Sequence, residues 1–186
     1  MAKAEYRSAI RSKKLINDAL ADLLLEKPLD KITVTDVVTR AGINRGTFYA
    51  HYADIPDVIN RLIQKTFSQI REVLSSEPHL MKVPEILLGQ IQNILESDME
   101  FYKKVMSSSA ASVMYEQVVN ITMDYLLQNE QEYAFTNHEQ YVLTIRFCAG
   151  GLGNLYRNWF EGKLDMSLSE LTQAAQKLLS SVMAIE

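Results

Sequence analysis

The sequence predicts an all-α protein of about nine helices, and three observations support this fold class. Hydrophobic residues make up 47% of the 186 residues, which is enough to bury a substantial core. Only four prolines and seven glycines interrupt the chain. Long stretches lack the strict alternation of apolar and polar residues that marks strands. We expect a domain of three helices in residues 1–53 and a larger helical domain in residues 54–186.

Three helical patterns make up the first domain. The first covers residues 8–26 and has apolar residues at helical spacing, and Pro28 ends it. Two short patterns follow, over residues 34–40 and 45–51, with only a few residues between them. Two short helices joined in this way predict a helix-turn-helix.

Local signals define the ends of these two short helices. Thr33 is placed to cap the first, with Asp36 in the acidic position of a capping box. Gly42 stands where a helix end needs a residue with left-handed backbone. Asn44 is placed to cap the second helix. The turn between the helices is therefore specified by residue types that favour it.

The second short helix has the composition of a DNA recognition helix. Its first turns carry polar and small side chains, which is the end that such a helix points at base edges and phosphates. Gly46 costs about 1 kcal/mol relative to Ala inside a helix, so we expect close backbone approach to a phosphate there. The candidate DNA-binding residues are Lys14, Thr33, Asn44, Arg45, Gly46, Thr47, Tyr49, His51 and Tyr52. A helix-turn-helix used only for packing is the alternative, and the expected exposure of Arg45, Thr47, Tyr49 and His51 argues against it.

The pattern T-x-x-D-[VI]-x-x-x-A-G-[VI]-x-x-G-T-[FL]-Y-x-[HY]-[FY], which residues 33–52 satisfy, resembles the DNA-binding signature of the TetR/AcrR family of bacterial repressors. This resemblance implies a homodimer on double-stranded operator DNA and a C-terminal domain that binds an unidentified small-molecule effector. One position departs from the family pattern. The fourth helix of the family usually starts with a Lys that meets a phosphate, and this chain has Ile55 and Pro56 there. We expect that contact to be missing.

The charge distribution agrees with DNA binding at the N-terminal end. Residues 1–52 carry nine Lys and Arg against six Asp and Glu, which gives +3. Residues 53–186 carry ten against seventeen, which gives −7, and the whole chain has a net charge of −4. Phosphates attract the first part and repel the second, so we expect the chain to approach DNA with its N-terminal domain.

Six helical patterns follow in the second domain. Asp54 and Asp57 are placed to cap a long helix that reaches about residue 75, and Thr136 with Glu139 forms a capping box for a later one. Ser167 and Glu170 start the last helix in the same way. The other predicted helices cover residues 84–96, a short stretch around 101–106, and residues 110–129, and the helix after Thr136 is expected to end at Gly162.

The middle of this domain contains methionine and aromatic residues that could line a ligand cavity, because methionine adapts to irregular apolar ligands. Ordinary core packing is the favoured alternative for any one of them, and only the family resemblance supplies an effector site in this part of the chain. The candidate pocket residues are Phe101, Tyr102, Met106, Met114, Val118 and Phe147.

The last two predicted helices carry glycines and an apolar stripe. Gly150, Gly151 and Gly153 are unfavourable in an isolated helix and so imply close contact with another helix. This segment resembles the C-terminal pair of one group of TetR-like regulators, in which two helices of each subunit build a four-helix dimer interface. The alternative is that the glycines pack against a helix of the same chain. The candidate interface residues are Gly150, Gly151, Leu155, Trp159, Leu171, Ala175, Leu178 and Val182.

The sequence contains little that supports other functional classes. The three histidines lack Cys, Asp or Glu at metal-ligand spacing, and no nucleophile motif or phosphate-binding loop occurs, so we expect no enzyme activity, no metal and no cofactor. The single Cys148 fits a buried apolar position. No apolar run is long enough for a membrane span, and the N-terminus lacks the pattern of a signal peptide, so we expect a cytoplasmic protein. The remaining alternative is a helical adaptor with weakened DNA binding.

Overall fold

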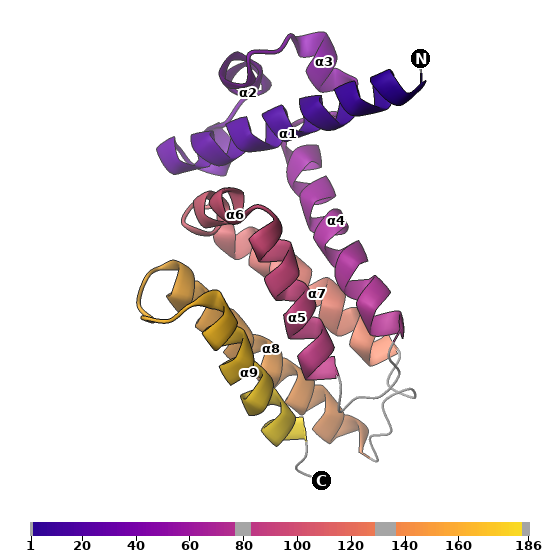
Figure 1. Ribbon diagram of the computed structural model, residues 1–186, viewed down its shortest axis with the longest axis vertical. Helices are drawn as coiled ribbons and strands as arrows, with labels where there is room; N and C mark the ends of the chain where they lie inside the picture. Colours follow the sequence, from indigo (N-terminus) through magenta and orange to yellow (C-terminus); the bar gives the residue numbers. More distant parts are fainter. Residues whose placement is uncertain (1, 77–82, 129–136, 184–186) are drawn as a thin grey trace. The chain divides into compact units, whose positions relative to one another are not determined.

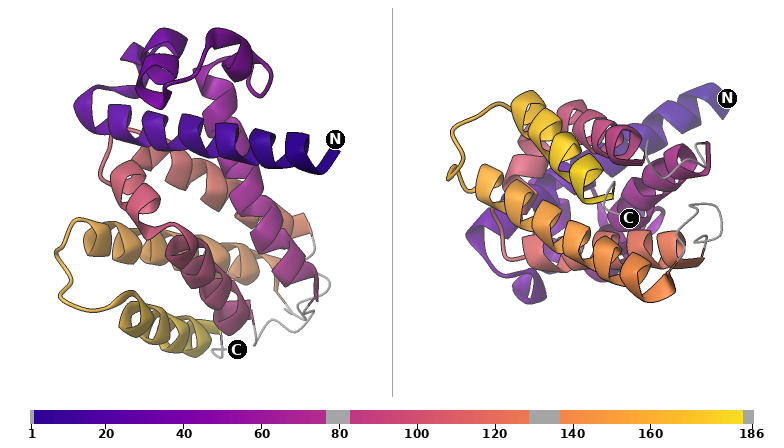
Figure 2. Two further views of the ribbon diagram at one scale, coloured as in Figure 1. Left: turned by 45° about the horizontal axis from the view of Figure 1, so that its top comes forward. Right: turned by 90° about the horizontal axis from the view of Figure 1, so that it is seen from below.

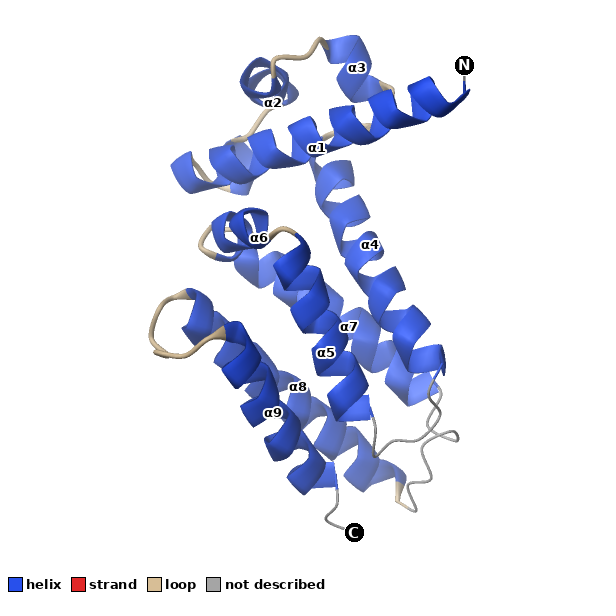
Figure 3. Cartoon of the chain, in the orientation of Figure 1, coloured by secondary structure: helices blue, strands red, loops and turns tan. Residues whose placement is uncertain are grey.

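The computed structural model describes residues 2–76, 83–128 and 137–183, and within these ranges every regular element is helical (Figure 3). The prediction of an all-α chain of about nine helices is confirmed for this part of the chain. No helix in the described ranges is long and apolar enough to cross a bilayer. The α-helices are α1 (Ala2–Glu26), α2 (Val34–Ala41), α3 (Arg45–Tyr49), α4 (Ile55–Ser76), α5 (Val83–Ser97), α6 (Met99–Met106), α7 (Ala111–Gln128), α8 (His138–Phe160) and α9 (Leu168–Met183), with a short 3₁₀ turn at Leu29–Lys31.

The chain forms two compact units that do not coincide with the predicted domains. One contains Met1–Ile63 and Glu100–Met114, and the other contains Gln64–Met99 and Tyr115–Glu186. Helix α4 therefore begins in the first unit and continues into the second, and α6 with the following turn belongs mostly to the first. The predicted division into a DNA-binding domain and an effector domain at residue 53 stays a prediction.

The first unit has its core where α1 packs against α2 and α3 (Figure 1). Ile16, Val37 and Phe48 are fully buried, one from each of these helices. Apolar residues recur at helical spacing along α1 and form one apolar face. This face lets α1 cover both α2 and α3. Phe48 is thus the core residue of α3.

The second unit is a set of helices in which α9 lies beside both α5 and α8 (Figures 1 and 2). The hydroxyl of the fully buried Tyr141 in α8 donates a 2.8 Å hydrogen bond to the carbonyl oxygen of Leu126 in α7. The predicted Ser167–Glu170 capping box at the start of α9 is confirmed by hydrogen bonds in both directions. The first contact joins α8 to α7 across the unit, whereas the capping box fixes the start of α9 by local chemistry.

The start of α8 differs from the sequence prediction. Asn137 caps this helix by accepting a 3.1 Å hydrogen bond from the backbone N–H of Gln140. The predicted cap, Thr136, lies outside the described residues. Asn is as good a helix cap as Ser or Thr, and the two neighbouring positions could not be separated by residue type alone. The helix ends at Phe160, and Gly162 follows with a left-handed φ of 70°.

Candidate nucleic-acid interface

Three local features define the two ends of α2 and the start of α3. Thr33 and Asp36 form a complete capping box at the start of α2, and Gly42 adopts a left-handed φ of 64° at its end. The side-chain oxygen of Asn44 accepts a 2.7 Å hydrogen bond from the backbone N–H of Thr47 and so caps α3. All three predictions are confirmed. The relative direction of the two helices is therefore set by backbone and cap geometry.

Helix α3 is shorter than predicted. It ends at Tyr49 rather than at residue 51, and His51 and Tyr52 follow in a turn and a loop. Apolar periodicity alone extended the prediction past the end, because the aromatic run continues to Tyr52 without a glycine or proline to stop it. His51 thus stands beyond the helix, and burial together with nearby Lys13 lowers its pKa.

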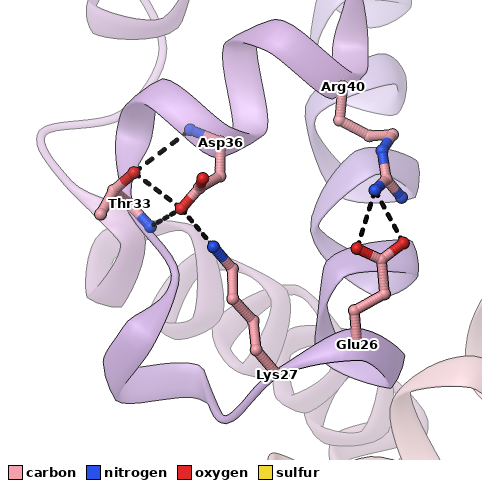
Figure 4. A network of polar contacts seen from close by, with 5 residues as sticks. All are labelled: Glu26, Lys27, Thr33, Asp36 and Arg40. Carbon is pink, nitrogen blue, oxygen red and sulfur yellow. Dashed lines mark hydrogen bonds and ion pairs between the residues drawn. The ribbon is translucent and has the colours of Figure 1, made fainter.

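Two ion pairs hold α2 against the end of α1 (Figure 4). The Lys27 ammonium lies 2.6 Å from the Asp36 carboxylate, and the Arg40 guanidinium lies 2.7 Å from that of Glu26. The hydrogen bonds from Lys27 and from Thr33 lower the pKa of Asp36 from 3.8 to about 2. Asp36 thus serves both the capping box and the link to α1.

A second set of contacts fixes the corner between α3 and α4. Tyr52 is 5% exposed and its hydroxyl donates a long, 3.4 Å hydrogen bond to Asn17 of α1. The Arg61 guanidinium lies over the Tyr52 ring at 5.7 Å and bonds Asp57, whose carboxylate also accepts from the backbone N–H of Ala53. Tyr52 is one of the candidate DNA-binding residues, and its burial shows that its side chain packs inside the unit.

The predicted DNA-contacting side chains of α3 do reach the surface. Arg45 is exposed, Tyr49 is 55% exposed, and Thr47 is half-buried because it belongs to the cap. The structure gives a reason for a glycine at position 46 that the sequence did not show. A Cβ there would lie 3.2 Å from the cap oxygen of Asn44, a contact tight enough to press on the cap.

Arg45 differs from several other cations of this unit in having no carboxylate partner among the described residues. Lys27 and Arg40 are paired with carboxylates inside the unit, and Lys14 forms an exposed i,i+4 pair with Asp18. Across the described part of the chain, no carboxylate lies within ion-pair distance of Arg45. Its guanidinium instead donates a 2.8 Å hydrogen bond to the hydroxyl of Thr35. Arg45 therefore presents a positive charge that an external anion or base can meet.

Sequence analysis missed Thr35. It lies in the first turn of α2 and is exposed, and its neighbour Thr33 was singled out because only Thr33 stands in the capping position. No motif position or spacing in the sequence points to Thr35, because its bond to Arg45 forms only across the turn between α2 and α3.

The candidate pocket residues do not form one enclosed group within either unit. Phe101, Met106 and Met114 belong to the first unit, and Val118 belongs to the second. Phe101 and Met114 are buried, whereas Phe147 is 69% exposed on α8. Phe147 therefore lies on the outer face of α8, since a side chain that exposed cannot line an enclosed cavity of its own chain. Tyr102 and Val118 are half-buried.

The candidate dimer residues divide into two groups. Leu171 and Ala175 are 2% and 1% exposed, so they pack inside their own chain. Gly150 and Gly151 are exposed, a Cβ added at either would meet no neighbouring atom within 4 Å, and Leu178 is 58% exposed. Leu155, Trp159 and Val182 are half-buried. The periodic stripe on α9 therefore faces mainly its own chain, because period alone does not say which neighbour covers it.

Comparison with known proteins agrees with this geometry. Residues 16–62 match the family described as bacterial regulatory proteins, tetR family, and residues 82–181 match a transcriptional regulator C-terminal region. The chain belongs to the TetR family and is a DNA-binding transcriptional regulator. The predicted family and function are confirmed, and the adaptor alternative gains no support.

Relatives resemble the chain in sequence, and solved structures resemble it in fold. The chain is 28% identical over 130 residues to the HTH-type transcriptional regulator YvdT of Bacillus subtilis, an alignment that covers 67% of each protein. Another B. subtilis regulator, YxbF, is 29% identical over 97 residues, and only 26% of its length is covered. The fold resembles the fatty acid degradation regulator FadR of Bacillus halodurans, with a TM-score of 0.65 at 17% identity, covering 91% of this chain and 94% of that one. It also resembles the dihydroxyacetone kinase operon activator DhaS, with a TM-score of 0.60 at 19% identity over 94% and 97% of the two chains.

Proposed function

We propose that the chain is a homodimeric repressor that binds a two-fold symmetric operator and leaves it when a small-molecule effector binds. The observation that carries the DNA contact is Arg45, an exposed cation at the start of α3 without a carboxylate partner in the described chain. Its partner DNA lies in the bacterial cytoplasm, where we place the protein. We propose no catalytic role.

The proposed contacts follow from position and chemistry. Arg45 and Thr47 would reach base edges in the major groove, and Tyr49 would hold a phosphate. Lys14 and Thr33 would steady the unit at the flanking backbone. The Lys14–Asp18 pair does not prevent this, because exposed ion pairs contribute little and exchange readily for a phosphate.

The proposed dimer rests on an exposed apolar face of α8. Leu143 and Phe147 are 68% and 69% exposed. Counted from Leu143, Phe147 stands at i+4, Gly150 at i+7 and Gly151 at i+8, so all four share one face of the helix. On α9, Leu178 is also exposed. Large apolar side chains in such a row are costly in water, and a second copy of the same helix pair would cover them. Two copies would present two α3 helices to successive major grooves, roughly 34–36 Å apart.

The proposed effector is a small apolar or amphipathic molecule bound among the helices of residues 54–186. Family membership alone supports this part of the proposal, because the candidate pocket residues do not form one enclosed group within either unit. Binding of the effector would change the tilt of α4, and this would change the distance between the two α3 helices of the dimer. Repression is the direction of regulation typical of the family, and a reporter gene placed behind the operator measures it.

A footprint on the DNA upstream of the gene, at several salt concentrations, tests this proposal. The wild-type chain should protect a short symmetric site with an affinity that falls steeply with salt. Arg45→Ala should lose base preference worth about 1–3 kcal/mol. Arg71→Ala, which removes an exposed arginine of α4 outside the first unit, is the matched control and should protect the same site. Diffuse protection by the wild-type chain would contradict the proposal.

The effector step has a separate test. Compounds that bind the protein, detected by a raised unfolding temperature, are added to the operator complex. At least one should weaken operator binding, and a reporter placed behind the operator should then increase. If no binding compound alters operator affinity, the effector part of the proposal fails while the DNA contact stands.

A further inference from the structure

Arg45 and Thr35 are joined across the turn between α2 and α3. The Arg45 guanidinium donates a 2.8 Å hydrogen bond to the Thr35 hydroxyl, and both residues are exposed. They lie in the first turns of their helices, ten residues apart in sequence. Because Gly42 and the cap of Asn44 set the turn, these two positions are brought together by the backbone and not by a flexible loop.

The hydrogen bond leaves most of the recognition chemistry of Arg45 unused. A guanidinium has five N–H donors in a planar fork, and the bond to Thr35 engages one nitrogen. The remaining donors can form the bidentate pair with O6 and N7 of guanine, which is the commonest specific contact of arginine in the major groove. One anchored edge also fixes the plane in which the other donors point.

Thr35 has no other structural task that explains its hydroxyl. Thr33 and Asp36 already cap α2. Thr35 faces solvent, so its side chain adds nothing to the core of the unit. A long arginine side chain that is already oriented loses less conformational freedom on binding. The Thr35 hydroxyl is well placed to supply that orientation.

We infer that Thr35 is a specificity-determining positioning residue, which holds the Arg45 guanidinium toward one guanine of each operator half-site. This inference rests on the proposed operator contact of Arg45. It adds the base type that Arg45 reads and a second residue, in a different helix, on which that reading depends.

Selection of preferred sites from a random duplex library tests the inference. The wild-type full-length chain and Arg45→Ala are compared first, and the base pair whose preference the variant loses identifies the base read by Arg45. That base should be a guanine. Thr35→Val, which keeps the shape and removes the hydroxyl, should reduce the preference at this base pair about three- to tenfold, the effect of one hydrogen bond. Preferences at other base pairs should remain.

Two further variants separate positioning from other effects. Thr35→Ser retains a hydroxyl and should restore the wild-type preference. Thr39→Val removes the hydroxyl of another exposed threonine, one turn later in α2, and should leave the preference at the Arg45 base pair unchanged. Unfolding midpoints of all variants are measured alongside. If Thr35→Val is unfolded, Thr35→Ala makes the same comparison without a β-branched apolar side chain.

Distinct results overturn the inference and the function. A wild-type chain that selects no site contradicts the proposed function and this inference with it. If the wild-type chain selects a site but Thr35→Val keeps full preference at the Arg45 base pair, or weakens binding to all sequences equally, the inference alone is overturned. A base other than guanine at that position also overturns it.

Discussion

The hydroxyl of Tyr115 in α7 lies directly over Gly153 in α8 and donates a 2.6 Å hydrogen bond to the carbonyl oxygen of Ala149. A Cβ at position 153 would come 1.6 Å from the Tyr115 oxygen, which no real contact allows. Gly153 therefore makes room for a side chain of its own chain. This is the alternative to a dimer contact that the sequence left open, and it applies to this one glycine of the three.

Gly153→Ala should destabilise the protein for this reason. The Tyr115 ring must leave its place and its hydrogen bond, at a cost of about 1–3 kcal/mol, which exceeds the gain of about 1 kcal/mol from replacing a helical glycine. Urea unfolding of the purified chain measures the difference. Gly89→Ala is the control, because nothing lies within 4 Å of a Cβ at this helical position, and it should be neutral or stabilising. Equal effects of the two substitutions would contradict the packing described.

The link between Lys27 and Asp36 should make stability depend on pH. The pKa of Asp36 is lowered to about 2 from its ordinary 3.8, chiefly by the hydrogen bond from Lys27. A carboxyl with a depressed folded-state pKa contributes stability that is fully present above pH 3.8 and is lost as the pH falls toward 2. Lys27→Met should raise the pKa of Asp36 in an NMR titration, and the difference in stability from wild type should shrink as the pH falls through this window.

Lys31→Met is the comparison for that experiment. Lys31 pairs on the surface with its sequence neighbour Asp30, and its side chain is 71% exposed. Its removal should leave the titration of Asp36 unchanged. An Asp36 pKa near 3.8 in the wild-type chain would show that the contact with Lys27 does not persist in solution.

Asn44 allows stability and DNA binding to be separated. Asn44→Ala removes the cap of α3 and should cost about 0.5–2 kcal/mol of stability. Asn44→Asp keeps a cap oxygen and should retain stability, but it adds a negative charge beside the proposed DNA contact and should weaken operator binding. Thermal unfolding and operator titration on the same samples check both effects. Full operator affinity in Asn44→Asp would argue that the start of α3 does not approach the phosphates.

The exposed face of α8 should control the oligomeric state. Phe147→Glu places a charge where we propose that two copies meet, and it should shift the protein from dimer to monomer in sedimentation velocity, with an unchanged helical spectrum. Leu25→Glu alters a similarly exposed apolar side chain, 52% exposed on α1, and should remain dimeric. A dimer that survives Phe147→Glu together with Leu178→Glu would place the interface elsewhere.

The sequence predicted best those features that depend on neighbouring residues. The capping box of Thr33, the left-handed Gly42 and the cap of Asn44 are each set within a few residues, so residue type and spacing were enough. The starts and ends of helices without such signals were less certain, as the extra two residues predicted for α3 show.

Features that depend on distant partners could not be predicted in the same way. The apolar stripe on α9 was recognised, but whether Leu171 faces its own chain or a partner depends on where α5 and α8 lie. Phe147 is a candidate pocket residue because it is aromatic and the family resemblance implies an effector site in this domain, and only the fold shows that its side chain is exposed. The Thr35–Arg45 bond depends on the angle of the turn, which no spacing rule supplies.

The ion pairs in Figure 4 also bear on what a substitution in the helix-turn-helix would change. Lys27, Asp36, Glu26 and Arg40 form the frame of the helix-turn-helix, whereas Arg45 and Thr35 face outward and take no part in those pairs. A substitution at position 35 or 45 should therefore change the outward surface of the helix-turn-helix while the ion pairs between α1 and α2 remain in place. In this chain the residues that join the helices and those that face outward are different side chains.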